Sequence, residues 1–210
     1  MLEIAVFVSG GGTNLQAIID RIADGTLANV RIACVIASRP GTYAEQRAAQ
    51  NGIPCRIVSR KSFATPEEYD QAMLAALAEW PIGLVVLAGF LSLLGPAFVD
   101  AYRNKIINIH PALIPSFCGT GLYGIRPHEA ALAYGVKLTG ATVHFVDEHY
   151  DQGPIILQKA VAVHQDDTPQ SLQLRVMQEA EQVILPQAIA LFAAGRIRIA
   201  GRRTIIEGED

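Results

Sequence analysis

Short apolar runs alternate with amphipathic stretches along the first half of the chain. The apolar runs predict strands, and they lie at 3–8, 30–36, 54–58, 84–88 and 106–109. The last two lack polar alternation, which is typical of strands with both faces buried. The amphipathic stretches predict helices at 14–23, 43–51 and 66–79. Strand–helix alternation of this kind predicts an α/β fold with a doubly wound, mostly parallel sheet.

The pattern changes after residue 110. Residues 111–127 form a long loop rich in Pro, Gly and Ser, and loops of this length inside a compact domain are more often functional than not. A short helix is then predicted at 127–134. A long helix is predicted to begin with a cap at Thr168 and Pro169 and to run to about residue 194. Further strands are predicted at 138–146 and 155–163, and alternating Arg and Ile over 196–206 predict a hairpin at an antiparallel C-terminal edge.

Two helix starts carry the signature of a capping box, in which a Ser or Thr side chain and a Glu or Gln three residues later satisfy free N–H groups. Thr65 and Glu68 form one such pair around Pro66. Thr13 and Gln16 form the other and predict a well-fixed start for the first helix.

Composition narrows the class of protein. The chain has 210 residues, half of them apolar and 18% charged, so one domain with a sizeable core is expected. Seventeen Lys and Arg against twenty Asp and Glu argue against a dedicated nucleic-acid binder. Three cysteines without CxxC spacing argue against a disulfide framework and a structural zinc site, and favour the cytoplasm.

No segment is expected to enter a membrane. The chain starts without the basic region of a signal peptide. Residues 80–99 carry no charge over a length that would span a bilayer, but Pro and Gly residues divide them into short pieces. A buried strand, a turn and a packed loop explain this stretch better.

The first candidate for chemistry is the segment Ser9-Gly10-Gly11-Gly12-Thr13-Asn14, between the first predicted strand and helix. Glycines there let a ligand approach the backbone, and a helix N-terminus favours an anion. Leu15 replaces the third glycine of the dinucleotide fingerprint, and the Gly-Lys pair of a P-loop is absent. A phosphomonoester fits best, while a tight turn without a ligand is the alternative.

The second candidate is Asn108 with His110, directly after a buried strand. Residues two apart in an extended chain point to the same side, so an amide and an imidazole reach one volume, as stabilising an oxyanion requires. The alternative is a structural histidine. The third candidate is the acidic turn 147–154, where one carboxylate could orient and charge His110 unless the turn is merely solvated.

His144 precedes the acidic turn and is interpreted as a hydrogen-bonded residue behind the site. A metal site made of His144, His149 and Asp151 has no familiar zinc spacing, so no metal is expected.

These segments together resemble the phosphoribosylglycinamide (GAR) formyltransferases, folate-dependent enzymes of purine synthesis. The matching pieces follow one another in order along nearly the whole chain; they are 8–16, 87–90, Asn108-Ile109-His110-Pro111 with Leu113, Pro115 and Ser116, 140–145, Asp151 and Gly153-Pro154. The resemblance implies a Rossmann-like formyltransferase fold. It implies formyl transfer from 10-formyltetrahydrofolate to GAR, without a metal, at the third step of de novo purine synthesis.

The resemblance also implies roles for individual residues. The catalytic set would be Asn108, His110 and Asp151, and the phosphate would be held by Gly12, Thr13 and Asn14. Gln178 and Glu181 would face the ribose and the glycinamide. The pterin pocket would be lined by Phe90, Leu91 and Leu94 with the backbone of a turn that includes Val146, Asp147 and Glu148; supporting positions would be His144, Ser116 and His128. Residues 1–107 would then be the phosphate-binding half and 108–210 the catalytic and folate half.

The chain departs from the family pattern in four places. The loop at 118–127 is longer than the usual form, and His128 matches the loop histidine. Pro66 and Ser92 stand where some members have basic residues for the folate tail, and Gln182 replaces a histidine.

Several rival functions share these features. A formyltetrahydrofolate hydrolase would use the same set but usually has an added N-terminal regulatory domain, and a methionyl-tRNA formyltransferase would need a tRNA-binding domain. The chain could also be a formyltransferase acting on another amine, or a binding module without catalytic activity. The expected partners are small molecules, without nucleic acid or membrane, and the expected assembly is a monomer or homodimer. Asp151 is expected to raise the pKa of His110 above its ordinary value.

Overall fold

The computed structural model describes residues 1–208 and divides the chain into two compact units, the first covering Met1–Ile107 and the second beginning at Asn108.

Five strands in the order β3-β2-β1-β4-β5 form the sheet of the first unit. Their bounds are β1 (Leu2–Val8), β2 (Val30–Ala37), β3 (Cys55–Ile57), β4 (Leu84–Leu87) and β5 (Ile106–His110), of which β5 continues into the second unit. β1 pairs in parallel with β2 and β4, and β2 pairs in parallel with β3. Parallel strands buried on both faces account for the apolar runs, and Ile4–Val8 is fully buried.

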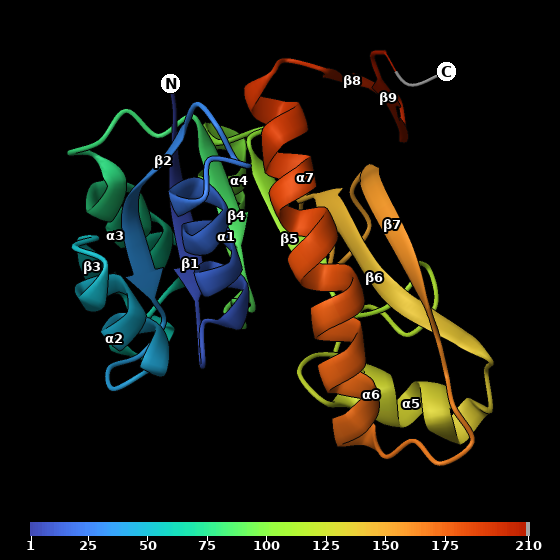
Figure 1. The fold of residues 1–210 in the computed structure, drawn as a ribbon. Helices are drawn as coiled ribbons and strands as arrows, with labels where there is room; N and C mark the ends of the chain where they lie inside the picture. The colour runs from blue at the N-terminus through green and yellow to red at the C-terminus, as the bar shows by residue number, and fades with distance from the viewer. Residues whose placement is uncertain (209–210) are drawn as a thin grey trace. The chain divides into compact units, whose positions relative to one another are not determined.

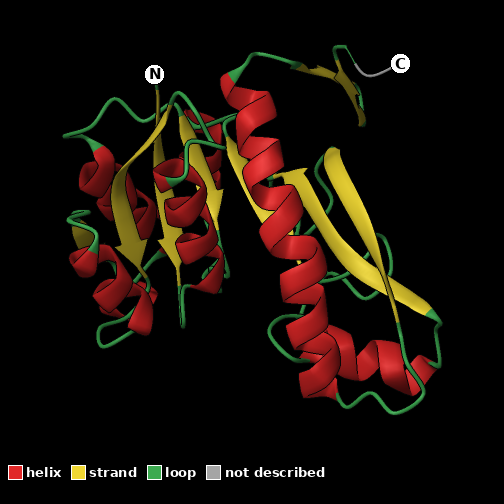
Figure 2. Ribbon diagram, viewed as in Figure 1, coloured by secondary structure: helices red, strands yellow, loops and turns green. Residues whose placement is uncertain are grey.

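Helices of the first unit cover these strands (Figures 1 and 2). Their bounds are α1 (Thr13–Ala23), α2 (Tyr43–Gln50), η1 (Arg60–Ser62), α3 (Pro66–Leu77) and α4 (Pro96–Ala101). The capping box at Thr65 and Glu68 is confirmed. The one predicted at Thr13 and Gln16 is wrong, because Gly12 is the N-cap of α1 in a left-handed conformation with no side-chain cap. The backbone N–H of Gln16 instead donates to the backbone carbonyl of Gly12, at 2.9 Å.

The uncharged stretch at 80–99 contains β4, a loop and the start of α4. The loop is held by the buried carboxylate of Asp70, which accepts the N–H of Gly95 at 2.8 Å and of Phe98 at 3.2 Å. Within residues 1–208 no helix is long and apolar enough to cross a membrane.

Strands of the second unit follow the order β5-β6-β7-β9-β8. The new strands are β6 (Leu138–Phe145), β7 (Ile155–Ala162), β8 (Ile197–Ala200) and β9 (Arg203–Ile206). β6 and β7 pair antiparallel, and β8 and β9 form an antiparallel hairpin whose second strand runs parallel to β7. The predicted fold class, a mostly parallel sheet with an antiparallel C-terminal edge, is confirmed.

One nearly continuous helical segment packs along β6 and β7 in the second unit (Figure 1). It consists of α6 (Pro169–Val176), the π-helical turn η2 (Met177–Glu181) and α7 (Gln182–Ala193), and α5 (Arg126–Tyr134) packs beside α6. The predicted cap at Thr168 is confirmed, since its side chain accepts the N–H of Ser171. The sequence pattern did not predict the π-helical turn, which interrupts what was expected to be one regular helix.

Candidate active site

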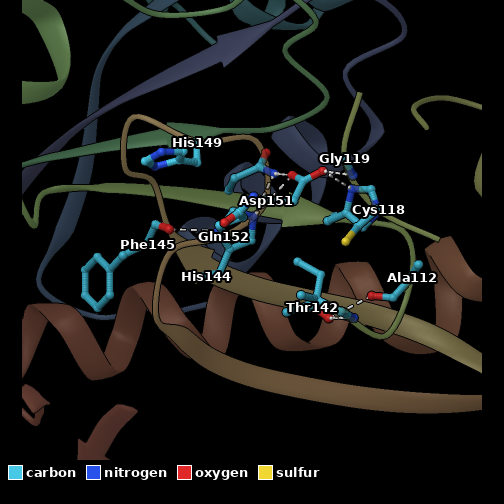
Figure 3. Close-up of polar contacts among 12 residues, drawn as sticks. Ala112, Cys118, Gly119, Thr142, His144, Phe145, His149, Asp151 and Gln152 are labelled. Atoms are coloured by element: carbon cyan, nitrogen blue, oxygen red, sulfur yellow. Dashed lines mark hydrogen bonds and ion pairs between the residues drawn. The ribbon is translucent and has the colours of Figure 1, made fainter. Parts of the chain in front are cut away.

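Three polar side chains of the second unit, those of Asn108, His110 and His144, lie around the carboxylate of Asp151. Figure 3 shows this carboxylate with His144 and Gly119. Oδ2 lies 3.6 Å from Nδ1 of His110 and accepts the backbone N–H of Gly119 at 2.9 Å. Oδ1 lies 3.5 Å from Nε2 of His144 and 3.5 Å from Nδ2 of Asn108. The structure therefore brings together the three residues predicted as the catalytic set, with His144 beside them.

Asn108 and His110 owe their common direction to the alternation of β5. His110 is buried, while Asn108 is half-buried. The carboxyl end of a strand in an open α/β sheet is where ligands are usually bound.

His144 lies at an irregularity in the β6–β7 pairing. Val143 pairs with Leu157 but His144 pairs with Ile155, so Ile156 is an extra residue on β7. Bulges of this type redirect side chains and are common beside active sites. Here the bulge lies at the end of β6 from which the His144 ring reaches Asp151 and Asn108.

The turn that carries Asp151 is tightly packed. Asp151 adopts a φ of 53°, in the left-handed region that is uncommon for residues other than glycine. At Gly153 a Cβ would lie 1.8 Å from the backbone oxygen of Phe145, so no other residue fits without moving the turn. Strain of this kind persists only where surrounding contacts hold it, and it gathers at functional sites.

The long loop after β5 is anchored at its start by Thr142 of β6 (Figure 3). Thr142 Oγ1 donates to the carbonyl of Ala112 at 2.7 Å and accepts the N–H of Ile114 at 3.1 Å. Nε2 of Gln158 lies 3.0 Å from both Thr142 Oγ1 and the carbonyl of Ile114.

Further along, the same loop contacts the predicted catalytic groups directly. The carbonyl oxygen of Phe117 lies 3.0 Å from Nε2 of His110, and the N–H of Gly119 donates to Asp151. Because a carbonyl can only accept, Nε2 of His110 carries the hydrogen in this state. Sequence reasoning identified the loop but did not predict these two backbone contacts, since no side-chain type signals them.

Burial lowers the pKa of His110 below its ordinary value, and this outweighs the opposing effect of the Asp151 carboxylate. The expectation of a raised pKa for His110 was therefore wrong, because it counted the carboxylate and left out desolvation. For Asp151, burial opposes ionisation, but the contacts with His144, His110 and Gly119 outweigh it and lower the pKa of the carboxyl. The free site thus holds an ionised Asp151 and a largely neutral His110.

Two of the supporting residues predicted from the family pattern do not hydrogen-bond to this cluster. Ser116 is exposed, and its backbone N–H donates to Leu113. His128 of α5 is fully buried, and neither ring nitrogen has a hydrogen-bond partner within the described part of the chain. Burial and the nearby charge of His110 lower the pKa of His128 to about 4.

Gln178 and Glu181 lie in the π-helical turn η2, which packs against β6 and β7. Glu181 is buried and Gln178 is exposed. Such turns are frequent at functional sites because they shift side chains relative to a regular helix.

The glycine turn belongs to the first unit and is supported by two arginines. Nε of Arg39 donates to the carbonyl of Ser9 at 3.1 Å, and Nε of Arg47 donates to that of Gly11 at 2.9 Å. At Gly12 a Cβ would lie 2.8 Å from Cβ of Ala44, whereas a Cβ at Gly11 would meet nothing within 4 Å. Gly12 is therefore required for packing, while Gly11 leaves the front of the turn open.

The apolar residues predicted for the pterin pocket divide between the units. In the first unit Phe90 and Leu94 are buried, with the Phe90 ring 5.2 Å from that of Phe7, while Leu91 is 57% exposed. In the second unit Val146 and Asp147 are half-buried and Glu148 is exposed.

Within residues 1–208 no group of three or more His, Cys, Asp and Glu side chains is placed to hold a metal ion. His149 is exposed, and its Nδ1 lies 3.8 Å from Asp147.

Comparison with known proteins identifies the family of the chain. The formyl transferase family matches residues 2–189. A phosphoribosylglycinamide formyltransferase of Haemophilus influenzae is 37% identical over 209 residues, covering all of this chain and 95% of that protein. The human trifunctional purine biosynthetic protein adenosine-3 is 41% identical over 94% of this chain, which spans only 19% of that protein's length.

Solved structures give the same assignment. Glycinamide ribonucleotide transformylase 1 from Symbiobacterium toebii superposes with a TM-score of 0.92 at 41% identity, covering 98% of this chain and 94% of that one. A formyltetrahydrofolate deformylase from Pseudomonas syringae is more distant, with a TM-score of 0.86 at 26% identity over 98% of this chain and 65% of that one. By its sequence and its fold, this chain belongs to the formyl transferase family.

Proposed function

We propose that the protein transfers the formyl group of 10-formyltetrahydrofolate to the amine of glycinamide ribonucleotide. The observation that carries the proposal is the meeting of Asn108, His110 and Asp151 at one point of the second unit. Full-length similarity to a phosphoribosylglycinamide formyltransferase supports the choice of substrate.

The reaction requires a group that stabilises the oxyanion and a group that transfers a proton from the amine to the folate nitrogen. The neutral amine attacks the formyl carbon, a C–N bond forms, and the carbonyl π electrons move to the oxygen. When the intermediate collapses, the bond to folate N10 breaks and its electron pair stays on N10. The proton lost by the amine is then taken up by N10, so that no oxidant or metal is required.

His110 supplies the hydrogen-bond donor for the oxyanion in this proposal. Its Nε2–H points at the Phe117 carbonyl in the free protein. The formyl oxygen would replace that carbonyl and accept the same hydrogen. A neutral imidazole can act in this way, and one such donor is typically worth about 10²–10³ in rate.

Asp151 is the acceptor in the proton transfer. Its pKa is lowered by its contacts, so the carboxylate is available near neutral pH to receive a proton from the amine, through water, and to pass it toward N10. Its negative charge also favours the cationic form of His110 whenever the imidazole ring takes up a proton during the reaction. Asn108 supplies a further polar group to the same volume.

The remaining roles follow the family pattern. Gly12, Thr13 and Asn14 would hold the phosphate at the start of α1, where the first N–H groups of a helix have no partner inside it. Gln178 and Glu181 would face the ribose and glycinamide. The family pattern assigns pterin contacts to Phe90, Leu91 and Leu94 of the first unit and, separately, to the backbone of the turn at Val146–Asp151 in the second unit.

A hydrolase or a formyltransferase for another amine would use the same groups. The test is a steady-state assay of 10-formyltetrahydrofolate consumption with GAR, without any amine, and with unrelated amines such as glycinamide. We expect consumption to depend on GAR. Equal consumption without an amine would instead indicate the hydrolase.

We also propose that the protein acts in the cytoplasm, as a monomer or homodimer, without a metal or a nucleic-acid partner. The net charge of −3 and the free cysteines at 34, 55 and 118 support this environment.

A further inference from the structure

The segment 88–95 of the first unit joins β4 to α4 and carries two exposed leucines. The side chains of Leu91 and Leu93 lie in solvent, whereas those of Phe90 and Leu94 are buried. An exposed apolar side chain adds little to the stability of the fold, and loops that carry such side chains are usually mobile. This segment is instead fixed at each end by a buried polar side chain from another element of the same unit.

Ser9, directly after β1, fixes the start of the segment. Its buried hydroxyl accepts the backbone N–H of Leu91 at 2.9 Å, and its own backbone N–H donates to the carbonyl of Gly89 at 3.1 Å. The hydroxyl of Ser38 donates to the same Ser9 oxygen at 2.7 Å, so both lone pairs of this oxygen are engaged. Ser9 begins the glycine turn, but its side chain therefore holds the segment 88–95.

Asp70 of α3 fixes the other end. Its buried carboxylate accepts the N–H groups of Gly95 and Phe98, which are the N-cap residue and the third residue of α4. These N–H groups have no partner inside the helix, and a glycine has no side chain to cap them, so Asp70 caps α4 from another helix. A Cβ at Gly95 would collide with the carboxylate, so this approach requires a glycine.

We propose that Ser9 and Asp70 are positioning residues for the folate: by fixing both ends of the segment 88–95, they hold it in the conformation that the pterin contacts. This inference rests on the proposed function and deepens it. A segment that is already ordered loses little conformational freedom when a ligand binds, so an anchor strengthens binding through the backbone it holds. Ser9 is thereby assigned to the folate, although it begins the turn predicted to bind the phosphate.

The first test is amide hydrogen exchange, followed by NMR, in the ligand-free, full-length protein. We expect the Leu91 amide to exchange about tenfold faster in Ser9→Ala than in the wild type, and the Gly95 amide about tenfold faster in Asp70→Asn. The amide of Val6, in the buried core of β1, reports global unfolding and should change less. Unchanged exchange at Leu91 and Gly95, or an equal acceleration at Val6, would overturn the inference.

The second test is the affinity for 10-formyltetrahydrofolate, measured by calorimetry without GAR. We expect its Kd to rise about threefold to tenfold in Ser9→Ala and in Asp70→Asn, the size of one lost hydrogen bond. In Asp70→Asn the KM for GAR should stay within about twofold of the wild type, because the Asp70 carboxylate holds the start of α4. A lower melting temperature with an unchanged Kd in both variants would assign the two residues to stability alone and overturn the inference.

Each variant has a matched control. Ser38→Ala removes the neighbouring hydroxyl but keeps the bond from Leu91 to Ser9, and Asp100→Asn neutralises an exposed carboxylate of α4. Both should bind 10-formyltetrahydrofolate as the wild type does, and a rise in Kd equal to that of the paired test variant would contradict the positioning role. A wild type that binds this folate but does not formylate GAR would refute the proposed function alone, whereas one that does not bind it would refute both.

Discussion

The Nδ1 atom of His110 lies 3.6 Å from Oδ2 of Asp151, outside the usual range of a hydrogen bond. The carboxylate therefore acts on the ring mainly through its charge, which raises the pKa of His110, while burial lowers that pKa by more. A variant that removes the charge of Asp151 but keeps its shape therefore distinguishes an electrostatic role of this residue from a purely structural one.

Asp151→Asn removes the charge and nearly keeps the shape. We predict that kcat falls by about 10²-fold or more, as for the loss of one electrostatic stabiliser. The pKa of His110 should fall further below its ordinary value, because an opposing effect is removed and burial remains. NMR titration of His110 and steady-state kinetics measure the two effects.

Asp166→Asn is the control, since Asp166 is an exposed residue of the same unit. It should leave both measurements unchanged. A normal His110 titration together with near-normal turnover in Asp151→Asn would show that Asp151 is only a turn residue.

The lowered pKa of the buried His128 should make the stability of the protein depend on pH. Its pKa is about 4 in the folded protein, against about 6.5 when unfolded, so the unfolded chain binds more protons between these values. The stabilisation is complete above pH 6.5 and is lost as pH falls toward 4. From pH 7 to pH 5, His128 should reduce the free energy of unfolding by about 2 kcal/mol.

His128→Leu should therefore flatten the acid side of the stability profile, measured by urea unfolding at pH 7 and pH 5. At pH 7 we expect stability equal to or above the wild type, because two buried nitrogens without partners are removed. His164→Leu is the control, because it replaces an exposed histidine. It should keep the wild-type dependence of the free energy of unfolding on pH. If His128→Leu kept it too, the buried ring would not be the cause.

Gly11→Ala tests the phosphate site without disturbing the fold. The added methyl group meets no protein atom within 4 Å, whereas at Gly12 it would collide with Ala44. We predict that the KM for GAR rises about tenfold or more, roughly 1.4 kcal/mol, while the KM for folate and the melting temperature stay unchanged. Gly12→Ala should instead lower the melting temperature. An unaltered KM for GAR in Gly11→Ala would show that the phosphate does not bind at this turn.

Leu91→Glu tests the pterin pocket. The Leu91 side chain is 57% exposed, so a charge there should have little effect on stability. If the pterin packs on this side chain, the Kd for a folate analogue should rise about tenfold or more, the size of one lost apolar contact. Calorimetry with Leu138→Glu, which alters a leucine that is 60% exposed on β6, provides the control. Equal affinities in the two variants would exclude Leu91 from the pocket.

Much of the fold was predictable from local patterns. The buried strands and the caps at Thr65 and Thr168 depend on residues close in sequence, and all were confirmed. The cap at Thr13 failed because Thr13 is already the first residue of the helix, with Gly12 in a left-handed conformation as the N-cap. The π-helical turn at Met177–Glu181 has no periodic signature in so short a segment.

That the residues of the candidate site lie together was predictable, but their electrostatics were not. Residue spacing and the family resemblance predicted that Asn108, His110 and Asp151 lie close together, and the structure confirms this proximity. The sign of the His110 pKa shift depends on burial, which the sequence does not show. The contact of Phe117 with His110 involves a backbone carbonyl and so carries no sequence signal.

The most direct test of formyl transfer follows the labelled carbon. The full-length protein is incubated with GAR and 10-formyltetrahydrofolate labelled with 13C in the formyl group, and the products are observed by 13C NMR. We predict that the label appears as the formamide carbon of formylated GAR in the wild type, with this signal accumulating about 10²-fold more slowly in Asp151→Asn. Label appearing as free formate at the same rate with or without GAR would contradict the account.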